Sequence, residues 1–183
     1  TNWSFLRAGE VYPGYPKCRE LQYGHADGNQ WVAAECDVSI RPGWFYHPEE
    51  DDKVKTVDQL TDLYYRSVGH NATLLLNFPV DRNGLIHPTD SLNAVSFHLR
   101  VQKELADNLL SSAKVSASDE RGGQFKVRAV TDGKYDTYWA TNDGVTTADL
   151  TFTFSQPTKM NRVMIQEYIP LGQRVKSFVV EYK

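Results

Sequence analysis

The stretch Thr73-Leu74-Leu75-Leu76-Asn77-Phe78 is an almost continuous apolar run that is followed at once by Pro79. Strands of parallel sheets that are covered by helices on both faces read as such runs, whereas half-exposed strands alternate apolar and polar residues. The run is also as short as a strand and shorter than most helices. It therefore predicts a strand of a parallel sheet that is buried on both faces.

The residues before this run predict a strand and then a helix. Residues 31–40 form a short apolar stretch with polar breaks that ends at Arg41-Pro42-Gly43, as a strand ends in a turn. Thr56 and Gln59 have the spacing of a capping box at the start of a helix. A helix is expected over residues 57–67, with one apolar face made of Val57, Leu60, Leu63 and Tyr64.

The residues after the run predict a last helix and then a different kind of domain. Asp90 could cap a helix that reaches about residue 108 and presents four apolar residues to a core: Leu92, Val95, Leu99 and Leu105. From residue 114 onward, short alternating runs at 150–154, 162–165 and 177–182 are separated by turn residues, as in all-β domains. The sequence predicts an α/β domain over residues 1–110 and an all-β domain over residues 111–183.

The amino-acid composition excludes some kinds of binding partner. The 183 residues carry a net charge of −3, with acids and bases interspersed, so no basic stripe is present that would follow a phosphate backbone. The apolar runs are too short for insertion into a membrane. Nucleic acid and membrane partners are therefore not expected.

Cys18 and Cys36 could form a disulfide or remain two free thiols, and both alternatives stay open.

Two segments resemble the catalytic domain of family 29 glycoside hydrolases, the α-L-fucosidases. Residues 31–47, WVAAECDVSIRPGWFYH, are similar to a signature late in that catalytic barrel, and residues 67–86, SVGHNATLLLNFPVDRNGLI, are similar to the strand and loop that follow it. The resemblance implies that residues 1–110 are the last part of a (β/α)8 barrel. The sequence of residues 39–44, SIRPGW, resembles that of the subgroup that acts on α-1,3- and α-1,4-linked fucose.

The resemblance implies a retaining exo-α-L-fucosidase that is secreted or periplasmic and acts on fucosylated oligosaccharides or glycoconjugates. Retaining glycosidases need one carboxylate as nucleophile and a second as general acid and base. In the family the nucleophilic aspartate precedes the segments matched here, so the remainder of a parent chain is expected to supply it. This chain alone is not expected to be active. No cofactor is expected for catalysis.

The family takes its acid/base glutamate from a variable loop before residues 31–47. Glu10, in a Gly-Glu pair soon after Trp3-Ser4, is the first candidate and Glu20 is the second. Either carboxyl would need a raised pKa, which partial burial against apolar neighbours provides. The alternative is that both are surface carboxylates and that the acid lies elsewhere.

Glu35 and Trp44 are candidates for substrate binding. Glu35 is expected near the end of a barrel strand, where active sites of barrels form, although it could instead orient a loop. Trp44 follows the Pro42-Gly43 turn and could hold the C5 methyl group of fucose against its indole, or could pack in the core. Arg41 and His47 could reach sugar hydroxyls, but structural or solvated roles are the plainer expectation.

The second domain resembles the coagulation factor 5/8 type C, or discoidin-like, sandwich. Residues 129–140, AVTDGKYDTYWA, carry this resemblance together with residues 161–163 and 165–168. Asp132, Asp136 and Thr137 could bind Ca²⁺ with help from backbone carbonyls, or could simply stabilise a turn. An appended sugar-binding domain would hold the enzyme near its substrate. The competing hypothesis is a glycan-binding or adhesion protein without catalytic residues.

Overall fold

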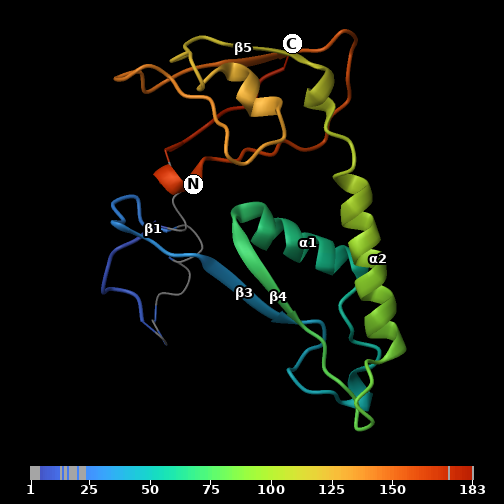
Figure 1. The fold of residues 1–183 in the computed structure, drawn as a ribbon. Helices are drawn as coiled ribbons and strands as arrows, with labels where there is room; N and C mark the ends of the chain where they lie inside the picture. The colour runs from blue at the N-terminus through green and yellow to red at the C-terminus, as the bar shows by residue number, and fades with distance from the viewer. Residues whose placement is uncertain are drawn as a thin grey trace. The chain divides into compact units, whose positions relative to one another are not determined.

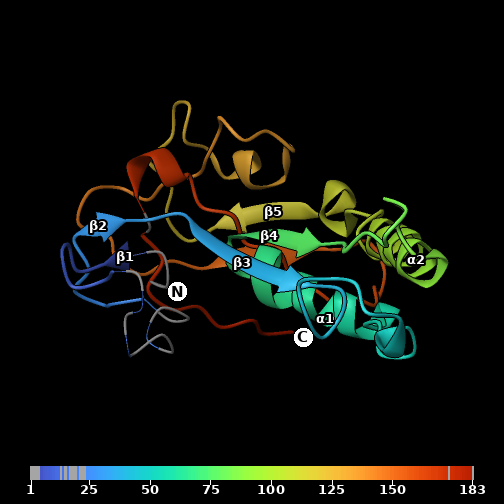
Figure 2. The same ribbon diagram turned by 90° about the horizontal axis from the view of Figure 1, so that it is seen from below.

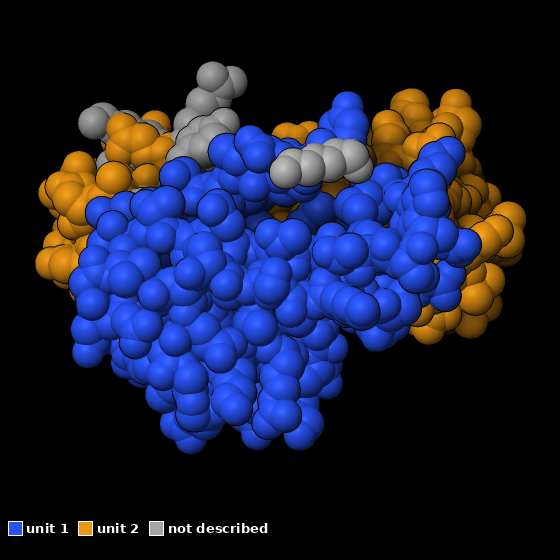
Figure 3. Space-filling view, turned by 90° about the horizontal axis from the view of Figure 1, so that it is seen from above, with its two compact units in different colours: residues 1, 107–183 blue, residues 2–106 orange. Residues whose placement is uncertain are grey.

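Two parallel strands, β3 (Ala34–Ser39) and β4 (Ala72–Asn77), organise residues 2–106 in the computed structural model (Figure 1). The structure describes residues 5–12, 14, 16, 20, 24–172 and 174–182. Residues 2–106 form one unit and residues 107–183 another, and the two are coloured separately in Figure 3. The arrows of β3 and β4 point the same way in Figure 2, as their parallel register requires.

Helix α1 (Val57–Ser67) connects β3 to β4 and has the bounds that the sequence predicts. The Gln59 backbone N–H donates to Thr56 Oγ1 at 3.3 Å, and the Thr56 backbone N–H donates to Gln59 Oε1 at 2.9 Å, so the capping box is confirmed. The predicted apolar face is also confirmed, because Leu60 is buried against Ile40 and Val54. Leu63, Leu76, Phe78 and Phe97 pack around this cluster.

Strand β4 confirms the predicted strand but not its burial on both faces. Leu74 and Leu76 are partly buried, whereas Leu75, which points to the opposite face, is 51% exposed. Successive side chains of a strand point to opposite faces, so only one face of β4 is covered within the described residues. The sheet there has two strands, and the closed barrel is not seen.

Helix α2 (Pro88–Glu104) ends earlier than predicted and is capped by a different residue. His87 Nδ1 accepts the Thr89 backbone N–H at 3.3 Å, so the cap is His87 and the prediction of an Asp90 cap is wrong. The face that meets α1 carries Phe97, whose ring lies 6.1 Å from that of Tyr64. Because this face packs instead, the predicted core residues Leu92, Val95, Leu99 and Leu105 are exposed.

Asp90 instead forms an ion pair with Arg41 in the interior. Arg41 Nε donates to Asp90 Oδ2 at 2.8 Å and Nη2 donates to Oδ1 at 2.9 Å, and both side chains are 0% exposed. Arg41 also lies 2.9 Å from Asp51 and stacks over the Tyr46 ring at 4.6 Å. A bidentate arginine–carboxylate pair fixes both distance and orientation. The pair therefore joins the end of β3 to the start of α2.

Among the described N-terminal residues, β1 (Phe5–Leu6) forms a short antiparallel pair with β2 (Gln30–Trp31). The buried His25 accepts the Arg7 backbone N–H on Nδ1 at 3.2 Å, and its own backbone N–H donates to the Phe5 carbonyl at 2.8 Å. Gly28 passes so close that a Cβ there would lie 2.7 Å from the Phe5 carbonyl carbon. Only glycine permits that approach.

In the described part of residues 107–183, the strands form one antiparallel pair, β5 (Lys114–Ala117) with β6 (Leu150–Thr153). The predicted strand at 150–154 is thus confirmed, but those at 162–165 and 177–182 are wrong. Exposed side chains such as Met164 and Val179 show the reason, because a strand needs a partner to satisfy its backbone and cover its apolar face. The sandwich is not seen.

Inside this unit, Tyr138 stacks on Tyr168 at 4.5 Å and lies 5.0 Å from Phe125. Trp139 Nε1 donates to the Asp119 carbonyl at 3.0 Å.

Among the described residues, no helix is both long and apolar enough to span a membrane. The 3-10 helices whose bounds lie within the described residues are Pro48–Glu50, Val68–His70, Leu109–Ser112, Val127–Thr131 and Ile169–Leu171.

Breaking the buried pair should destabilise residues 2–106 strongly. We expect Asp90→Ala to lower the free energy of unfolding by about 3–5 kcal/mol, because Arg41 would remain charged and buried without its main partner. Urea unfolding measures this change. Asp62→Ala is the matched control, because it removes an exposed ion pair with Arg66 and should change stability by less than about 1 kcal/mol. Equal effects of the two substitutions would contradict the assignment.

Candidate functional site

The candidate site forms at the edge where β3 and β4 end together. Ser39 and Asn77 are paired in register, and Asn77 Nδ2 donates both to Ser39 Oγ at 3.1 Å and to the Trp44 carbonyl at 3.1 Å. The loop after β3 is thereby attached to the end of β4. Trp44 itself is 51% exposed, so its indole is free to contact a ligand and is not a core residue among the described residues.

Glu35 lies at the other end of the strand. It is the second residue of β3 and pairs in register with Thr73, near the start of β4. The prediction that Glu35 lies near the C-terminal end of a strand is therefore wrong. Strand β3 begins at Ala34 and ends at Ser39, whereas the apolar pattern predicted a strand that begins at Trp31.

Arg41 is not available to a ligand, because the buried contacts with Asp90 and Asp51 occupy its guanidinium. The Asp90 carboxylate, and after it that of Asp51, hold the pKa of Arg41 above its ordinary value. Arg41 Nη1 also donates to the His47 carbonyl at 3.4 Å. This side chain therefore orders the loop that carries Trp44, Tyr46 and His47 and does not bind sugar itself.

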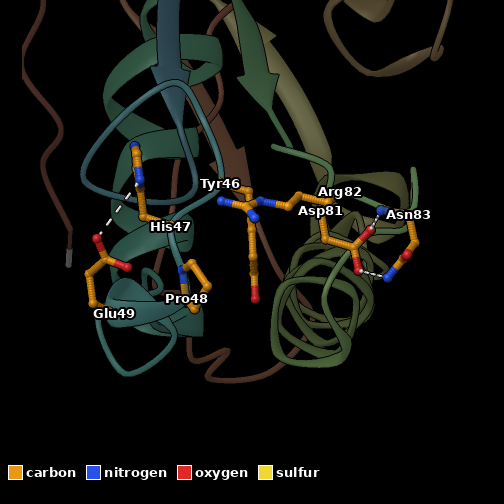
Figure 4. A pocket seen from close by; sticks show the side chains of 7 residues that line it. All are labelled: Tyr46, His47, Pro48, Glu49, Asp81, Arg82 and Asn83. Carbon is orange, nitrogen blue, oxygen red and sulfur yellow. Dashed lines mark hydrogen bonds and ion pairs between the residues drawn. The ribbon is translucent and has the colours of Figure 1, made fainter.

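A pocket of about 330 Å³ opens beside this loop. Residues after β3 form one wall and residues after β4 form the other, as the close-up in Figure 4 shows. The seven lining residues are Tyr46, His47, Pro48, Glu49, Asp81, Arg82 and Asn83. Active sites of parallel α/β folds form at this edge, outside the carboxyl ends of the strands.

Asp81 is the most strongly fixed group in the pocket wall. Its Oδ1 accepts the backbone N–H groups of Asn83 at 2.8 Å and Leu85 at 2.9 Å. These hydrogen bonds, that from Leu85 first, hold the pKa of Asp81 below its ordinary value. The carboxylate is thus ionised and fixed in orientation. At neutral pH this wall of the pocket therefore carries one carboxylate, Asp81, beside one cation, Arg82.

Tyr46 is held from three sides. Its hydroxyl donates to Asp51 Oδ2 at 3.3 Å, its ring lies under Arg41, and its centroid is 6.2 Å from that of His87. Burial, and after it the negative charge of Asp51, raises the pKa of the Tyr46 hydroxyl. The ring therefore remains a neutral and rigid wall.

The two candidate acids lie in the N-terminal loop. Glu10 Oε2 is 3.3 Å from Arg7 Nη1, and the Glu10 side chain is 53% exposed. Glu20 Oε2 is 3.5 Å from His25 Nε2, and its side chain is 41% exposed. The apolar burial that was expected around the acid is not present at Glu10 within the described residues. Cys18 lies outside the described residues, so the choice between a disulfide with Cys36 and two free thiols stays open.

The expected cation ligands form a hydrogen-bonded turn. Asp132 Oδ1 accepts the Lys134 backbone N–H at 3.0 Å, and Oδ2 accepts the Thr137 hydroxyl at 2.8 Å. The Lys134 N–H first, and then the Thr137 hydroxyl, hold the pKa of Asp132 below its ordinary value. Across the described residues, no group of three or more His, Cys, Asp or Glu side chains is placed to hold a metal ion.

Sequence reasoning did not identify the pocket residues Asp81, Arg82 and Asn83. A signal was present, because a polar Asp-Arg-Asn-Gly turn follows the predicted strand after only three residues. Loops after parallel strands carry the functional residues of such folds. His87 and Asp51 were also missed, since neither belongs to a motif.

Comparison with known proteins bears out both resemblances. The F5/8 type C domain model matches residues 114–183. Alpha-L-fucosidase 1 of Arabidopsis thaliana is 37% identical over 99% of this chain and 36% of its own length. A crystal structure of a candidate α-L-fucosidase from Bacteroides thetaiotaomicron shares 43% identity with a TM-score of 0.78, over 84% of this chain and 34% of that chain.

A third relative includes a bound sugar. It is a GH29 fucosidase of Ruminococcus gnavus in complex with fucose, 36% identical with a TM-score of 0.64, over 69% of this chain and 26% of that chain. The chain spans about a third of the length of the curated relatives that it matches, 34% of one and 36% of the other. It is thus similar, over nearly its whole length, to one portion of α-L-fucosidases.

Thr137→Val should raise the pKa of Asp132 toward its ordinary value, because the hydroxyl that stabilises the carboxylate is lost while the Lys134 N–H remains. The pKa of Asp132 is lower in the folded than in the unfolded protein, so the Asp132 carboxylate stabilises the folded protein at a pH above its unfolded pKa. This stabilisation is lost as the pH falls through the folded pKa. In Thr137→Val, where the folded pKa is higher, the loss should occur at a higher pH. A carbon-detected NMR titration of Asp132 measures the change. Thr131→Val is the control, since that hydroxyl donates to the Arg128 carbonyl. An unchanged Asp132 pKa in Thr137→Val would contradict this account of the turn.

Proposed function

We propose that this chain supplies part of the catalytic domain and part of an appended β domain to a retaining exo-α-L-fucosidase that releases terminal α-linked L-fucose from glycans. The observation that carries the proposal is the similarity to fucosidases over 98% and 99% of the chain in two relatives. The exposed Trp44 and the pocket at the strand edge agree with it. The enzyme would be secreted or periplasmic.

The finer architecture belongs to the same proposal. Residues 1–110 would supply the closing strands and helices of a (β/α)8 barrel, and residues 111–183 the first part of a discoidin-like sandwich. Two features support this assignment. The parallel pair β3 and β4 with α1 between them is the repeating unit of such barrels. The exposed Leu75 on β4 and the exposed apolar stripe of α2 are surfaces that further strands and helices would cover.

Trp44 would bind the fucose ring. Fucose has a methyl group on C5, which makes one side of the sugar apolar, and an indole face offers the matching surface. The Pro42-Gly43 turn and the hydrogen bond from Asn77 to the Trp44 carbonyl fix the backbone from which the indole projects. Glu35, at the opposite end of β3, would have a structural role instead.

Glu10 would act as the general acid and base. The group must first protonate the departing glycosidic oxygen and then, as a carboxylate, activate water against the fucosyl–enzyme intermediate. The acid step favours a carboxyl that is shielded from water, since burial disfavours the charged form. The remainder of the parent chain would therefore have to cover Glu10 and supply the nucleophilic aspartate. Glu20 is the second candidate for the same role.

Ca²⁺ at Asp132, Asp136 and Thr137 stays a prediction. Ca²⁺ takes about 6–8 oxygen ligands, so backbone carbonyls would have to add to these three side chains. Both oxygens of Asp132 already accept hydrogen bonds, so the residues fit the ion only in part. The β domain would raise the effective concentration of the enzyme near glycans with or without the ion.

Glu10→Ala in the complete protein should reduce turnover of natural fucosides about 10²–10⁴-fold, the usual contribution of general acid–base catalysis. An aryl fucoside with a very good leaving group needs little protonation, so its first step should suffer less. Azide attacks without a general base and should restore the second step. The assay is therefore hydrolysis of both substrates, with and without azide.

Glu20→Ala is the matched comparison, because it removes the second carboxylate of the same loop. Loss and azide rescue in Glu20→Ala but not in Glu10→Ala would transfer the role to Glu20. If neither substitution lowers activity, the acid lies outside this loop. A complete protein that binds fucosylated glycans and hydrolyses none of them would establish the non-catalytic alternative.

A further inference from the structure

We propose that His87 is a positioning residue whose protonation tightens the loop that carries Trp44, so that a fucoside binds more strongly at acidic than at alkaline pH. The inference rests on the proposed fucosidase function and adds to it a dependence on pH that is separate from the catalytic carboxyl groups. His87 does not line the pocket, and it caps the start of α2. The contacts of its ring with two loops carry the inference.

Asp51 is the group through which His87 acts on the loop. Asp51 Oδ1 lies 2.9 Å from Arg41 Nη1, and Asp51 Oδ2 accepts the Tyr46 hydroxyl at 3.3 Å. One carboxylate thus holds two positions of the loop after β3, and the exposed Trp44 lies between them in the sequence. The order of the loop around Trp44 therefore depends on where the Asp51 carboxylate is held.

His87 attaches this carboxylate to the start of α2. Its Nε2 lies 3.6 Å from Asp51 Oδ2, and its ring centroid is 6.2 Å from that of Tyr46. Because Nδ1 accepts the Thr89 backbone N–H at 3.3 Å, the neutral ring carries its proton on Nε2, the atom that faces Asp51. The side chains of His87 and Asp51 are 27% and 35% exposed, so water and salt screen their contact only in part.

The charged groups around His87 favour a cation at this position. Among the described residues, carboxylates of three segments face the ring: Asp51 of the loop after β3, Asp90 of α2 and Asp81 of the loop after β4. Arg41 is the cation that is bound to Asp51 and Asp90. These three carboxylates and one guanidinium together carry a net negative charge, which attracts a second cation.

Protonation of His87 exchanges a neutral hydrogen bond for contacts between opposite charges. The second proton binds to Nδ1, which then no longer accepts the Thr89 N–H and becomes a donor 4.0 Å from Asp90 Oδ1. The ring is then a cation and attracts the Asp51 carboxylate more strongly. Contacts between charged groups are stronger than neutral hydrogen bonds, so the protonated ring holds Asp51 more tightly. Histidine side chains change charge between about pH 5 and 8, so the effect falls within this range.

The test measures hydrolysis of an aryl α-L-fucoside by the complete protein at about pH 5.5 and at about pH 8. His87→Asn cannot be protonated, yet asparagine is a good helix cap and can still accept the Thr89 N–H. At the acidic pH we expect the KM of His87→Asn to exceed that of the wild type about two- to fivefold, as for one partly exposed ion pair, with kcat unchanged. At the alkaline pH the two KM values should agree. His98→Asn, the same change at an exposed histidine of α2, is the matched control and should leave KM unchanged at both pH values.

A second measurement does not depend on catalysis. In an NMR titration of the complete protein, the indole N–H resonance of Trp44, identified by its loss in Trp44→Phe, should shift in step with the ring resonances of His87. It should not do so in His87→Asn. If the protein hydrolyses fucosides but the KM ratio is the same at both pH values, or the Trp44 resonance does not follow His87, the positioning role alone is overturned. A protein without fucosidase activity would overturn the proposed function, and the titration would still decide whether His87 positions the loop.

Discussion

The buried ion pair of Arg41 and Asp90 is the constraint on which the rest of residues 2–106 depends. Two charges that are 0% exposed are stable only together, because either one alone would be buried without compensation. Arg41 follows the end of β3 and Asp90 lies in the first turn of α2, 49 residues later. Their bidentate contact sets how the strand end and the helix start meet. Asp51 and Tyr46 then pack around the same guanidinium.

The candidate site is a consequence of this arrangement. The loop after β3 is held by Arg41 from within and by Asn77 at the strand edge, so Trp44 and Tyr46 project from a fixed backbone. The loop after β4 is ordered separately, through the hydrogen bonds of Asp81. The two loops enclose the pocket between them. Charged groups in the interior thus order the site, while other polar groups remain free to meet a ligand.

Local patterns in the sequence were sufficient for the elements that depend on local forces. The capping box at Thr56 and Gln59 predicted α1 to the residue, and the apolar run predicted β4. The short motifs that carry the family resemblances were equally local, and the comparisons confirmed both. Trp44 could be singled out because a rigid turn precedes it.

Several of the wrong predictions involve partners that are distant in sequence. No sequence motif connects Arg41 to Asp90, so the sequence predicted only a helix cap at Asp90. The apolar stripe of α2 was expected in a core, but the helix packs through Phe97 and the stripe stays exposed. Residues 162–165 and 177–182 alternate like strands, yet alternation supplies no pairing partner. Glu35 was misplaced because a boundary between two short strands has no marker in the sequence.

The central claim is that a glycan binds at the edge where β3 and β4 end. A crystal structure of the complete protein with a thio-linked, and therefore uncleaved, fucosylated N-acetyllactosamine tests it most directly. The account predicts the C5 methyl group of fucose against the indole of Trp44, at the edge where β3 and β4 end. Fucose bound at the opposite end of β3, beside Glu35, would contradict it.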